Sequence, residues 1–183
     1  MRRFGFFTWV ALFLLAASIG LLAASMATRK WLSGTYTLGQ MSLKNFDVGL
    51  FTVSVDGVVH DRRRFFQSYT TEFQITVILL SFGGGLLLVA TGSYILFIIR
   101  DSGVGVLLFL LTSFSSGIFI LAGAVYFFNH VRSGVVQNMS SDISVFLSIL
   151  SGAIVISNIV NLCTAAKKGE LDSDTKAERT RLN

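Results

Sequence analysis

The stretch ITVILLSFGGGLLLVATGSYILFII runs from Ile75 to Ile99 without a charged residue. An α-helix rises about 1.5 Å per residue, so roughly 20 residues cross a bilayer core about 30 Å thick, and this stretch is long enough. Three other uncharged apolar runs have comparable length: Phe4–Ala27, Val104–Phe128 and Ile143–Leu162. The chain has 183 residues, of which 52% are hydrophobic. The sequence therefore predicts an integral membrane protein with four transmembrane helices, at residues 4–27, 75–99, 104–128 and 143–162.

The connections between these runs predict a single membrane domain that covers residues 1–183. Residues 28–74 form the only long connection. An even number of spans places both termini on the same side of the membrane. The final segment, residues 167–183, is short and mixed in charge, so we predict a disordered tail there.

The first apolar run also has features of a cleavable signal peptide, because Arg2 and Arg3 precede it and small residues lie near its end. Its length favours a retained span, since it exceeds the usual apolar core of a signal peptide. Small residues also recur at four-residue spacing in this run, a pattern that lets transmembrane helices pack closely: Ala16, Gly20 and Ala24. The fourth run has a similar pair in Ser148 and Gly152.

A β-hairpin is predicted inside the long connection. Apolar residues alternate with polar ones before Asp56-Gly57, and a β-branched pair follows. Asp-Gly is typical of a type I′ turn, which joins two strands through residues with positive φ. We predict strands at residues 36–38, 46–55 and 58–62, because a lone hairpin is marginal in water. The predicted fold class is a membrane α-helical four-helix bundle with a small extracellular β-sheet, formed mainly by the first outer loop.

Two aromatic residues of the long connection carry specific expectations. Trp31 follows two cations at the end of the first span, as is typical of a residue at the membrane interface. Phe51 is expected to pack inward against Trp31 within the sheet. Gly49, between these two in the chain, indicates a bulge or a close backbone approach in the middle of a strand.

Charge distribution barely decides the orientation, because cations flank the spans on both sides. Asn138-Met139-Ser140 is an N-glycosylation sequon in the connection between the third and fourth spans, and a glycan is added only on the lumenal side. An unused Asn138 is an equally good interpretation of so short a motif. Lys167 and Lys168 favour a cytosolic C-terminus, so we predict that both termini are cytosolic and that the hairpin is outside.

The spans contain none of the charged residues that mark proton relays, coupled transporters and voltage sensors. Asn158 and Asn161 are their most polar side chains, and they need partners either across helices or among headgroups at the span end. The chain offers no recognisable catalytic constellation, so we expect no enzyme activity, no cofactor, no metal site and no nucleic-acid partner. The single cysteine, Cys163, ends the fourth span, where it fits either reversible palmitoylation or an ordinary apolar environment.

The layout resembles the superfamily of claudins, peripheral myelin proteins and calcium-channel γ subunits. The residues that carry the resemblance are Trp31 soon after the first span and Gly49-Leu50-Phe51 in a long first outer loop. The claudin signature has a second tryptophan and two cysteines here, and this chain has Phe51 and no cysteine in the loop. The chain is more similar to the clarins, through Gly57 and the opening of the third span, GVGVLLFLLTSFSSG, at residues 103–117. The resemblance implies a plasma-membrane organiser at sensory-cell, junctional or synaptic membranes.

Two functional classes follow from these features. The first is a non-enzymatic organiser or auxiliary subunit that contacts membrane lipids, other membrane proteins and further copies of itself. The alternative is an oligomeric pore or small-solute channel whose selectivity comes from charges in the outer loop. The cluster Arg62, Arg63 and Arg64 fits either a charged contact with a partner or a position beside the lipid headgroups.

Overall fold

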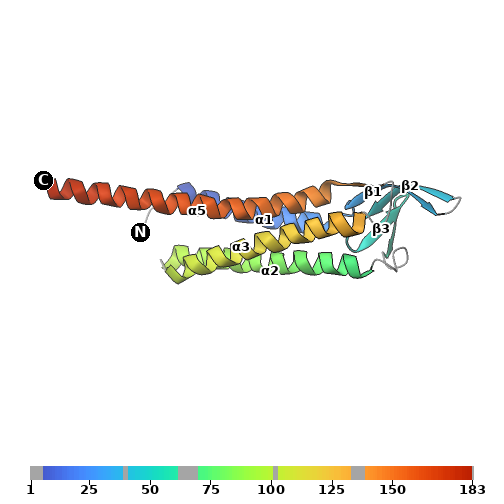
Figure 1. Cartoon of the computed structure of the whole chain (residues 1–183), viewed down its shortest axis with the longest axis horizontal. Coiled ribbons are helices and arrows are strands. Elements are labelled where there is room, and N and C mark those ends of the chain that lie inside the picture. Colours follow the sequence, from blue (N-terminus) through green and yellow to red (C-terminus); the bar gives the residue numbers. More distant parts are fainter. Residues whose placement is uncertain (1–5, 39–40, 62–69, 101–102, 133–138, 183) are drawn as a thin grey trace.

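The computed structural model describes residues 6–38, 41–61, 70–100, 103–132 and 139–182. A long helical bundle carries a small β-sheet at one end (Figure 1). The beginning of helix α1 (Phe6–Ala27) and the end of helix α5 (Ile143–Leu182) lie at the opposite end from the sheet. Two further helices complete the bundle, α2 (Thr70–Arg100) and α3 (Gly103–Tyr126), and a π-helical turn, η3 (Phe127–Arg132), continues α3.

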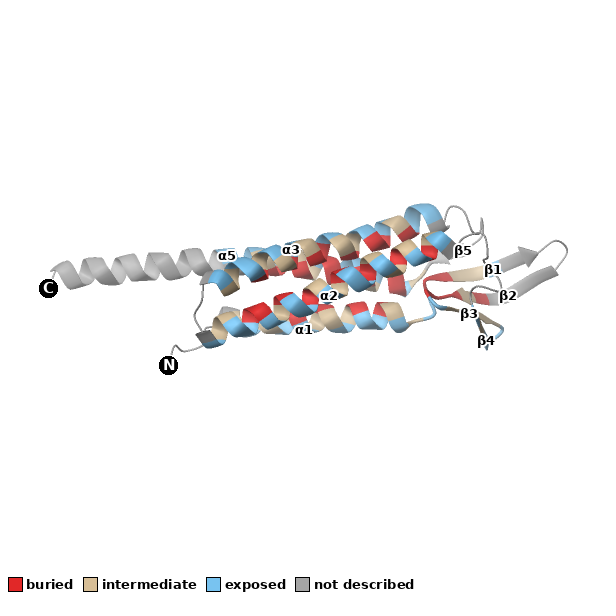
Figure 2. Ribbon diagram, turned by 90° about the horizontal axis from the view of Figure 1, so that it is seen from below, coloured by how far each residue is buried: buried red, intermediate tan, exposed pale blue. Residues whose placement is uncertain are grey.

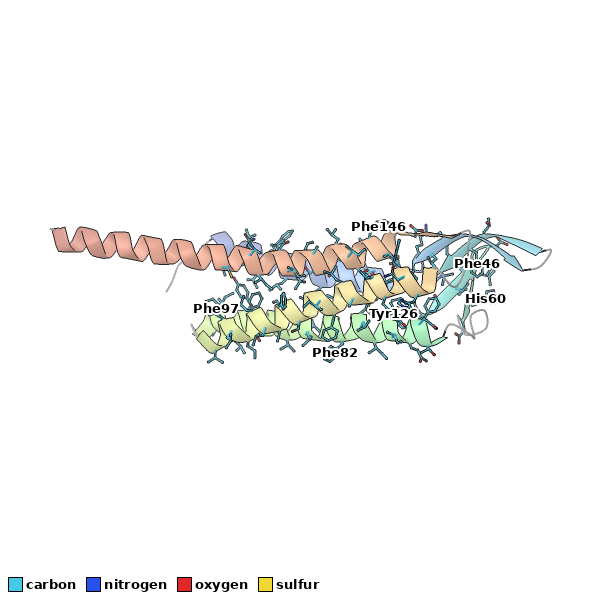
Figure 3. The ribbon with its side chains drawn as sticks, viewed as in Figure 1. Phe46, His60, Phe82, Phe97, Tyr126 and Phe146 are labelled. Carbon is cyan, nitrogen blue, oxygen red and sulfur yellow. The ribbon has the colours of Figure 1, made fainter. Side chains whose placement is uncertain are left out.

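All four helices are long and apolar enough to cross a membrane, over residues 8–27, 71–99, 104–130 and 143–161. These segments overlap the four predicted runs closely. Their exposed surfaces are rich in large apolar side chains, as expected of surfaces that face lipid. Phe82 on α2 and Phe146 on α5 lie on such outer surfaces (Figure 3).

Helices α1 and α5 pack antiparallel along a regular seam. Buried residues recur at alternating intervals of four and three on both helices, which keeps one face of each helix against its partner. On α1 these residues are Ala11, Leu15, Ser18, Leu22 and Ser25. On α5 they are Ser144, Ser148, Ser151, Val155 and Asn158. In Figure 2 the buried positions line the sides of the helices that face one another.

Helix α3 crosses α5 where two glycines meet. An ideal Cβ built on Gly117 would lie 2.6 Å from Cγ1 of Ile156, and one built on Gly152 would lie 2.8 Å from Cγ of Leu121. These distances are too short for a real Cβ, so the missing side chains allow the helices to approach closely. The predicted packing positions Ser148 and Gly152 are both buried on α5, and Gly152 is the one that meets α3 at this crossing.

Among the described residues the sheet has five antiparallel strands, in the order β4-β3-β2-β1-β5. Four come from the long connection, β1 (Leu32–Leu38), β2 (Met41–Val48), β3 (Thr52–Val55) and β4 (Val58–Asp61). The fifth, β5 (Met139–Ser141), comes from the connection between the last two spans. The predicted hairpin is confirmed, because Val55 pairs with Val58 and the turn residues Asp56 and Gly57 have φ of 47° and 85°.

The predicted strand over residues 46–55 is wrong. The chain reverses direction inside it, so that Phe46 of β2 pairs with Val55 of β3. Gly49-Leu50-Phe51 is the turn that joins these two strands, and the amide of Gly49 donates a 2.8 Å hydrogen bond to the carbonyl of Thr52. Regular alternation of apolar residues on both sides of the turn made two short strands resemble a single long one.

The predicted disordered tail is also wrong, because α5 continues as one helix to Leu182. The segment that follows the membrane span contains no proline and many strong helix formers, including alanine, lysine, glutamate and arginine. Helix α5 extends well past the ends of the other helices (Figure 1).

Candidate interaction surface

The sheet is joined to the bundle around Trp31. This side chain is fully buried, and its indole N–H donates a 2.8 Å hydrogen bond to the carbonyl of Ser25 on α1. Its ring meets that of Phe127 edge to face, with centroids 4.7 Å apart. The Trp31 side chain is therefore enclosed by protein, because the bundle supplies both an apolar pocket and a partner for the indole.

The π-helical turn η3 supplies Phe127 to this contact. Phe127 also meets Phe73 of α2 edge to face, with centroids 5.8 Å apart, so one ring joins α2, α3 and the start of the sheet. On the same turn, His130 stacks on Tyr126 at 4.3 Å and is exposed. A π-helical turn rotates the residues that follow it relative to an α-helix.

Main-chain hydrogen bonds also hold together the two segments that link the sheet to α1 and to α5. The amide of Trp31 donates to the carbonyl of Val48 at 2.8 Å, and the carbonyl of Trp31 accepts from the amide of Asp142 at 3.1 Å. The amide of Ser144 donates to the carbonyl of Lys30 at 3.3 Å. We call the group formed by Ser25, Trp31, Ser33, Phe127 and Asp142 the junction. Because it lies where α1 ends and α5 begins, the junction holds the sheet to two helices at once.

Asp142 is the charged member of the junction. One carboxylate oxygen accepts a 2.6 Å hydrogen bond from the amide of Ile143, which caps the N-terminus of α5, and the other accepts a hydrogen bond from the hydroxyl of Ser33 on β1. The Ser33 hydrogen bond is the main cause that lowers the pKa of Asp142, with smaller contributions from the Ile143 amide and from Lys30, against the opposing effect of desolvation.

We expect Asp142 to make stability depend on pH. Because the folded state lowers its pKa below the ordinary 3.8, the ionised form stabilises the fold fully above that value, and this stabilisation is lost as the pH falls through the folded-state pKa. Asp142→Asn keeps a capping oxygen but removes the charge, so the variant should lose less thermal stability on acidification than the wild type. Asp142→Ala should cost about 1 kcal/mol at neutral pH through loss of the cap.

Thermal unfolding of the purified protein at several pH values measures both effects. Asp56→Asn is the matched control, because Asp56 is exposed and asparagine also tolerates positive φ. An identical pH profile for wild type and Asp142→Asn would contradict the assigned role.

Three hydrogen bonds continue from the junction along the seam between α1 and α5. Ser25 donates to the carbonyl of Ser144 at 2.9 Å, Ser151 donates to the carbonyl of Ser18 at 2.9 Å, and Asn158 donates to the carbonyl of Ala11 at 3.2 Å. Their positions are seven residues apart on each helix, or about 10.5 Å along the axis. Asn158 is therefore satisfied in part across helices, although its Oδ1 has no partner among the described residues.

The predicted inward position of Phe51 is wrong. Phe51 is 54% exposed, and Leu50 is the buried residue of this turn. Gly49 does make the predicted close backbone approach, because an ideal Cβ there would lie 3.0 Å from Cα of Arg29 and 3.3 Å from the carbonyl oxygen of Thr28. The turn therefore rests on the end of α1, and Trp31 takes its aromatic partner from η3 instead.

The β3–β4 hairpin carries two exposed apolar residues. Val58 is 58% exposed and Val59 is 42% exposed. Successive side chains on a strand point to opposite faces, so the exposure of both valines means that β4 is uncovered on both faces. Strand β4 is also the last strand on its side of the sheet among the described residues.

The ladder formed by Ala16, Gly20 and Ala24 lies on the exposed side of α1. An ideal Cβ on Gly20 would meet no atom within 4 Å. The ladder therefore does not pack within the bundle, because α5 and α2 contact other sides of α1. Leu22, between these positions in the chain, faces inward and would touch a Cβ built on Gly84 of α2.

The remaining predicted positions lie apart from the junction. Cys163 is exposed just past the last span. Asn138 and the cluster Arg62, Arg63 and Arg64 lie outside the described residues. Within the described part of the chain, no group of three or more His, Cys, Asp or Glu residues could hold a metal ion.

The sequence analysis missed Asp142 and Phe127. Asp142 stands directly before an apolar run, which is the position of a helix N-cap, so this signal was present in the sequence. Phe127 lay within a predicted span and had no signal that distinguished it from other aromatic residues there. Comparison of the chain with family models and with curated proteins gives no match.

Proposed function

We propose that the protein is a non-enzymatic membrane organiser or auxiliary subunit, similar to the clarins. It acts through lateral and extracellular contacts with other membrane proteins, with lipids and with further copies of itself. Its proposed place is the plasma membrane of sensory cells, junctions or synapses, with both termini in the cytosol. The observation that supports this function most is the exposed edge hairpin of Val58 and Val59, presented by a sheet that the junction ties to the helices.

The junction gives the hairpin a defined position relative to the membrane. Strand β1 follows α1 after four residues, and β5 precedes α5 by one residue. Trp31 and Asp142, which lie in these short connections, join the elements by hydrogen bonds. A surface held in this way loses little conformational freedom when it binds a partner, and this reduces the entropic cost of association. Exposed apolar side chains on an edge strand are also the usual features of a protein contact site.

The interior of one bundle favours this function over a pore through a single chain. Large apolar side chains fill it among the described residues, including Leu80, Leu87, Phe109, Ile120 and Val155. Most of the buried serine hydroxyls in the described spans donate to main-chain carbonyls, as Ser116 does to Gly83 at 2.7 Å. The oligomeric pore predicts unitary currents from purified protein in planar bilayers, whereas the organiser predicts none.

The test of the proposed function is a graded change of Val58 and Val59. Replacing both with threonine keeps the β-branched shape and removes apolar surface, whereas replacing both with glutamate adds charge. The measurement is the recovery of partners that are cross-linked to the protein at the cell surface. Recovery should fall partly for the threonine pair and at least about tenfold for the glutamate pair. A tenfold fall corresponds to a loss of roughly 1.4 kcal/mol of binding free energy. Surface delivery should stay normal, because both positions are exposed.

Thr35→Glu is the control, because Thr35 is exposed on β1, away from the β3–β4 hairpin. It should leave partner recovery unchanged. Normal recovery with the glutamate pair at normal surface levels would show that the hairpin is not the contact surface.

A further inference from the structure

Phe51 is a half-exposed aromatic residue in the turn between β2 and β3. Its neighbour Leu50 is fully buried, so the two adjacent side chains of the β2–β3 turn point in opposite directions. Trp31, the aromatic partner expected for Phe51, is fully buried against Phe127 and Ser25. The outward direction of Phe51 therefore follows from the fold of the turn.

The turn lies at the level where the first span leaves the membrane. The apolar span of α1 ends at Ala27, and Gly49 is held against Thr28 and Arg29, the next two residues. Two trans peptide units separate Phe51 from Gly49, so their Cα atoms are at most about 7.6 Å apart. The interfacial layer on each side of the hydrocarbon core is roughly 5–8 Å thick. Phe51 is therefore close enough to the end of the span for its ring to reach this layer.

We propose that Phe51 is a membrane anchor of the sheet, with its ring inserted into the bilayer leaflet on the sheet side of the bundle. The partner is the lipid interface itself. An apolar phenylalanine ring gains free energy when it leaves water for the boundary between headgroups and acyl chains, and the exposed Arg29 beside the turn is placed to attract lipid phosphate groups. The assignment holds for either orientation of the protein, because it refers only to the side on which the sheet lies.

Exposed apolar residues on the helices also reach the level of the sheet. Phe128 in η3 and Ile143 and Phe146 at the start of α5 are exposed at the same end of the bundle. Val58 and Val59 lie instead toward the tip of the β3–β4 hairpin, where Val58 pairs with Val55, whereas Phe51 directly precedes the other end of β3. The anchor adds a second attachment beside the junction and fixes the height of the sheet above the bilayer. It does not depend on the proposed function.

The test places a nitroxide spin label at position 51. Cys163 is the only cysteine, so Cys163→Ser gives a background without cysteine, and Phe51→Cys and Val58→Cys each add one site for the label. Both variants are reconstituted into phosphatidylcholine nanodiscs. Collision rates are then measured with oxygen, which concentrates in lipid, and with a nickel chelate, which stays in water.

We expect the ratio of oxygen to nickel collisions to be several-fold higher at position 51 than at position 58. A ratio at position 51 as low as that at position 58 would place Phe51 in water and overturn the proposal. Protection from both reagents would place it under protein, either a second copy or another part of this chain, and would also overturn it. Unfolding temperatures equal to that of the Cys163→Ser background show that the labelled variants are folded.

A second measurement compares Phe51→Trp with Phe51→Asp in the full-length protein with native cysteine. Tryptophan keeps the preference for the interface and aspartate removes it. The stability gained on transfer from detergent micelles to nanodiscs should be retained by Phe51→Trp and reduced in Phe51→Asp. An equal gain for both variants would contradict insertion of this side chain.

Discussion

Replacing Trp31 with alanine is expected to destabilise the protein by about 3–5 kcal/mol, the usual cost of truncating a fully buried aromatic residue. Trp31 is 0% exposed, contacts the ring of Phe127 and donates its indole hydrogen to Ser25. Its removal leaves a cavity where α1, η3 and the sheet meet. Because the same residue joins β1 to β2 and to Asp142 through its main chain, relaxation into the cavity disturbs the whole junction.

Trp31→Phe separates packing from hydrogen bonding at this site. Phenylalanine keeps most of the ring contact and leaves the carbonyl of Ser25 without its donor, so we expect an intermediate loss of about 1–3 kcal/mol. Trp9→Ala is the matched control, because Trp9 is 63% exposed on the outer surface of α1. Denaturant or thermal unfolding of the three variants in the same detergent measures the order of their losses in stability. Equal effects at positions 9 and 31 would contradict the central place of Trp31.

The helices could be predicted well because the physical signal is strong. An uncharged run such as Ile75–Ile99 has few alternatives in a membrane, where each main-chain group needs a hydrogen bond within the chain. The helix ends were predicted less accurately, since α2 begins at Thr70 and includes polar residues that the apolar run excluded. The register between α1 and α5 could not be predicted, because the pairs Ser25–Ser144 and Ser18–Ser151 have meaning only once the two helices are known to be partners.

The outer loop shows which turns can be predicted from the local sequence and which cannot. Asp56-Gly57 predicted its turn correctly, because positive φ at both positions is a local property. Gly49-Leu50-Phe51 did not, because the turn there depends on a distant contact between Gly49 and Arg29 at the end of α1. The alternation of side chains in β2 and β3 is the same whether or not the chain reverses between them. The direction of Phe51 was therefore decided by tertiary structure.

The small-residue ladders illustrate the same limit. Gly20 and Gly152 both belong to small-residue patterns with four-residue spacing, so both were expected to pack against another helix. Only Gly152 does so within the chain. A four-residue spacing identifies a helix face but does not say what covers it, and α1 uses the face of Ser18 and Ser25 to contact α5.

Gly152→Leu is expected to destabilise the bundle by at least about 1–3 kcal/mol, the range for inserting bulk into a packed core. A Cβ at position 152 would already lie 2.8 Å from Cγ and 3.0 Å from Cδ2 of Leu121, and 3.3 Å from the main-chain oxygen of Gly117. Leucine adds three further carbons in the same direction. The obstacle includes main chain of α3, so a change of side-chain rotamer in Leu121 cannot make enough room, and α3 and α5 must separate.

Gly20→Leu provides the comparison, because a Cβ at Gly20 meets nothing within 4 Å. In a single chain this change should be neutral or slightly stabilising, since leucine has a higher helix propensity than glycine by up to about 1 kcal/mol. Unfolding in detergent at low protein concentration should therefore separate the two variants clearly. The oligomeric state of each variant in nanodiscs then shows whether a second copy covers Gly20. Equal destabilisation of the two variants in the monomeric state would contradict the close crossing of α3 and α5, because the two glycines differ only in what a side chain would meet.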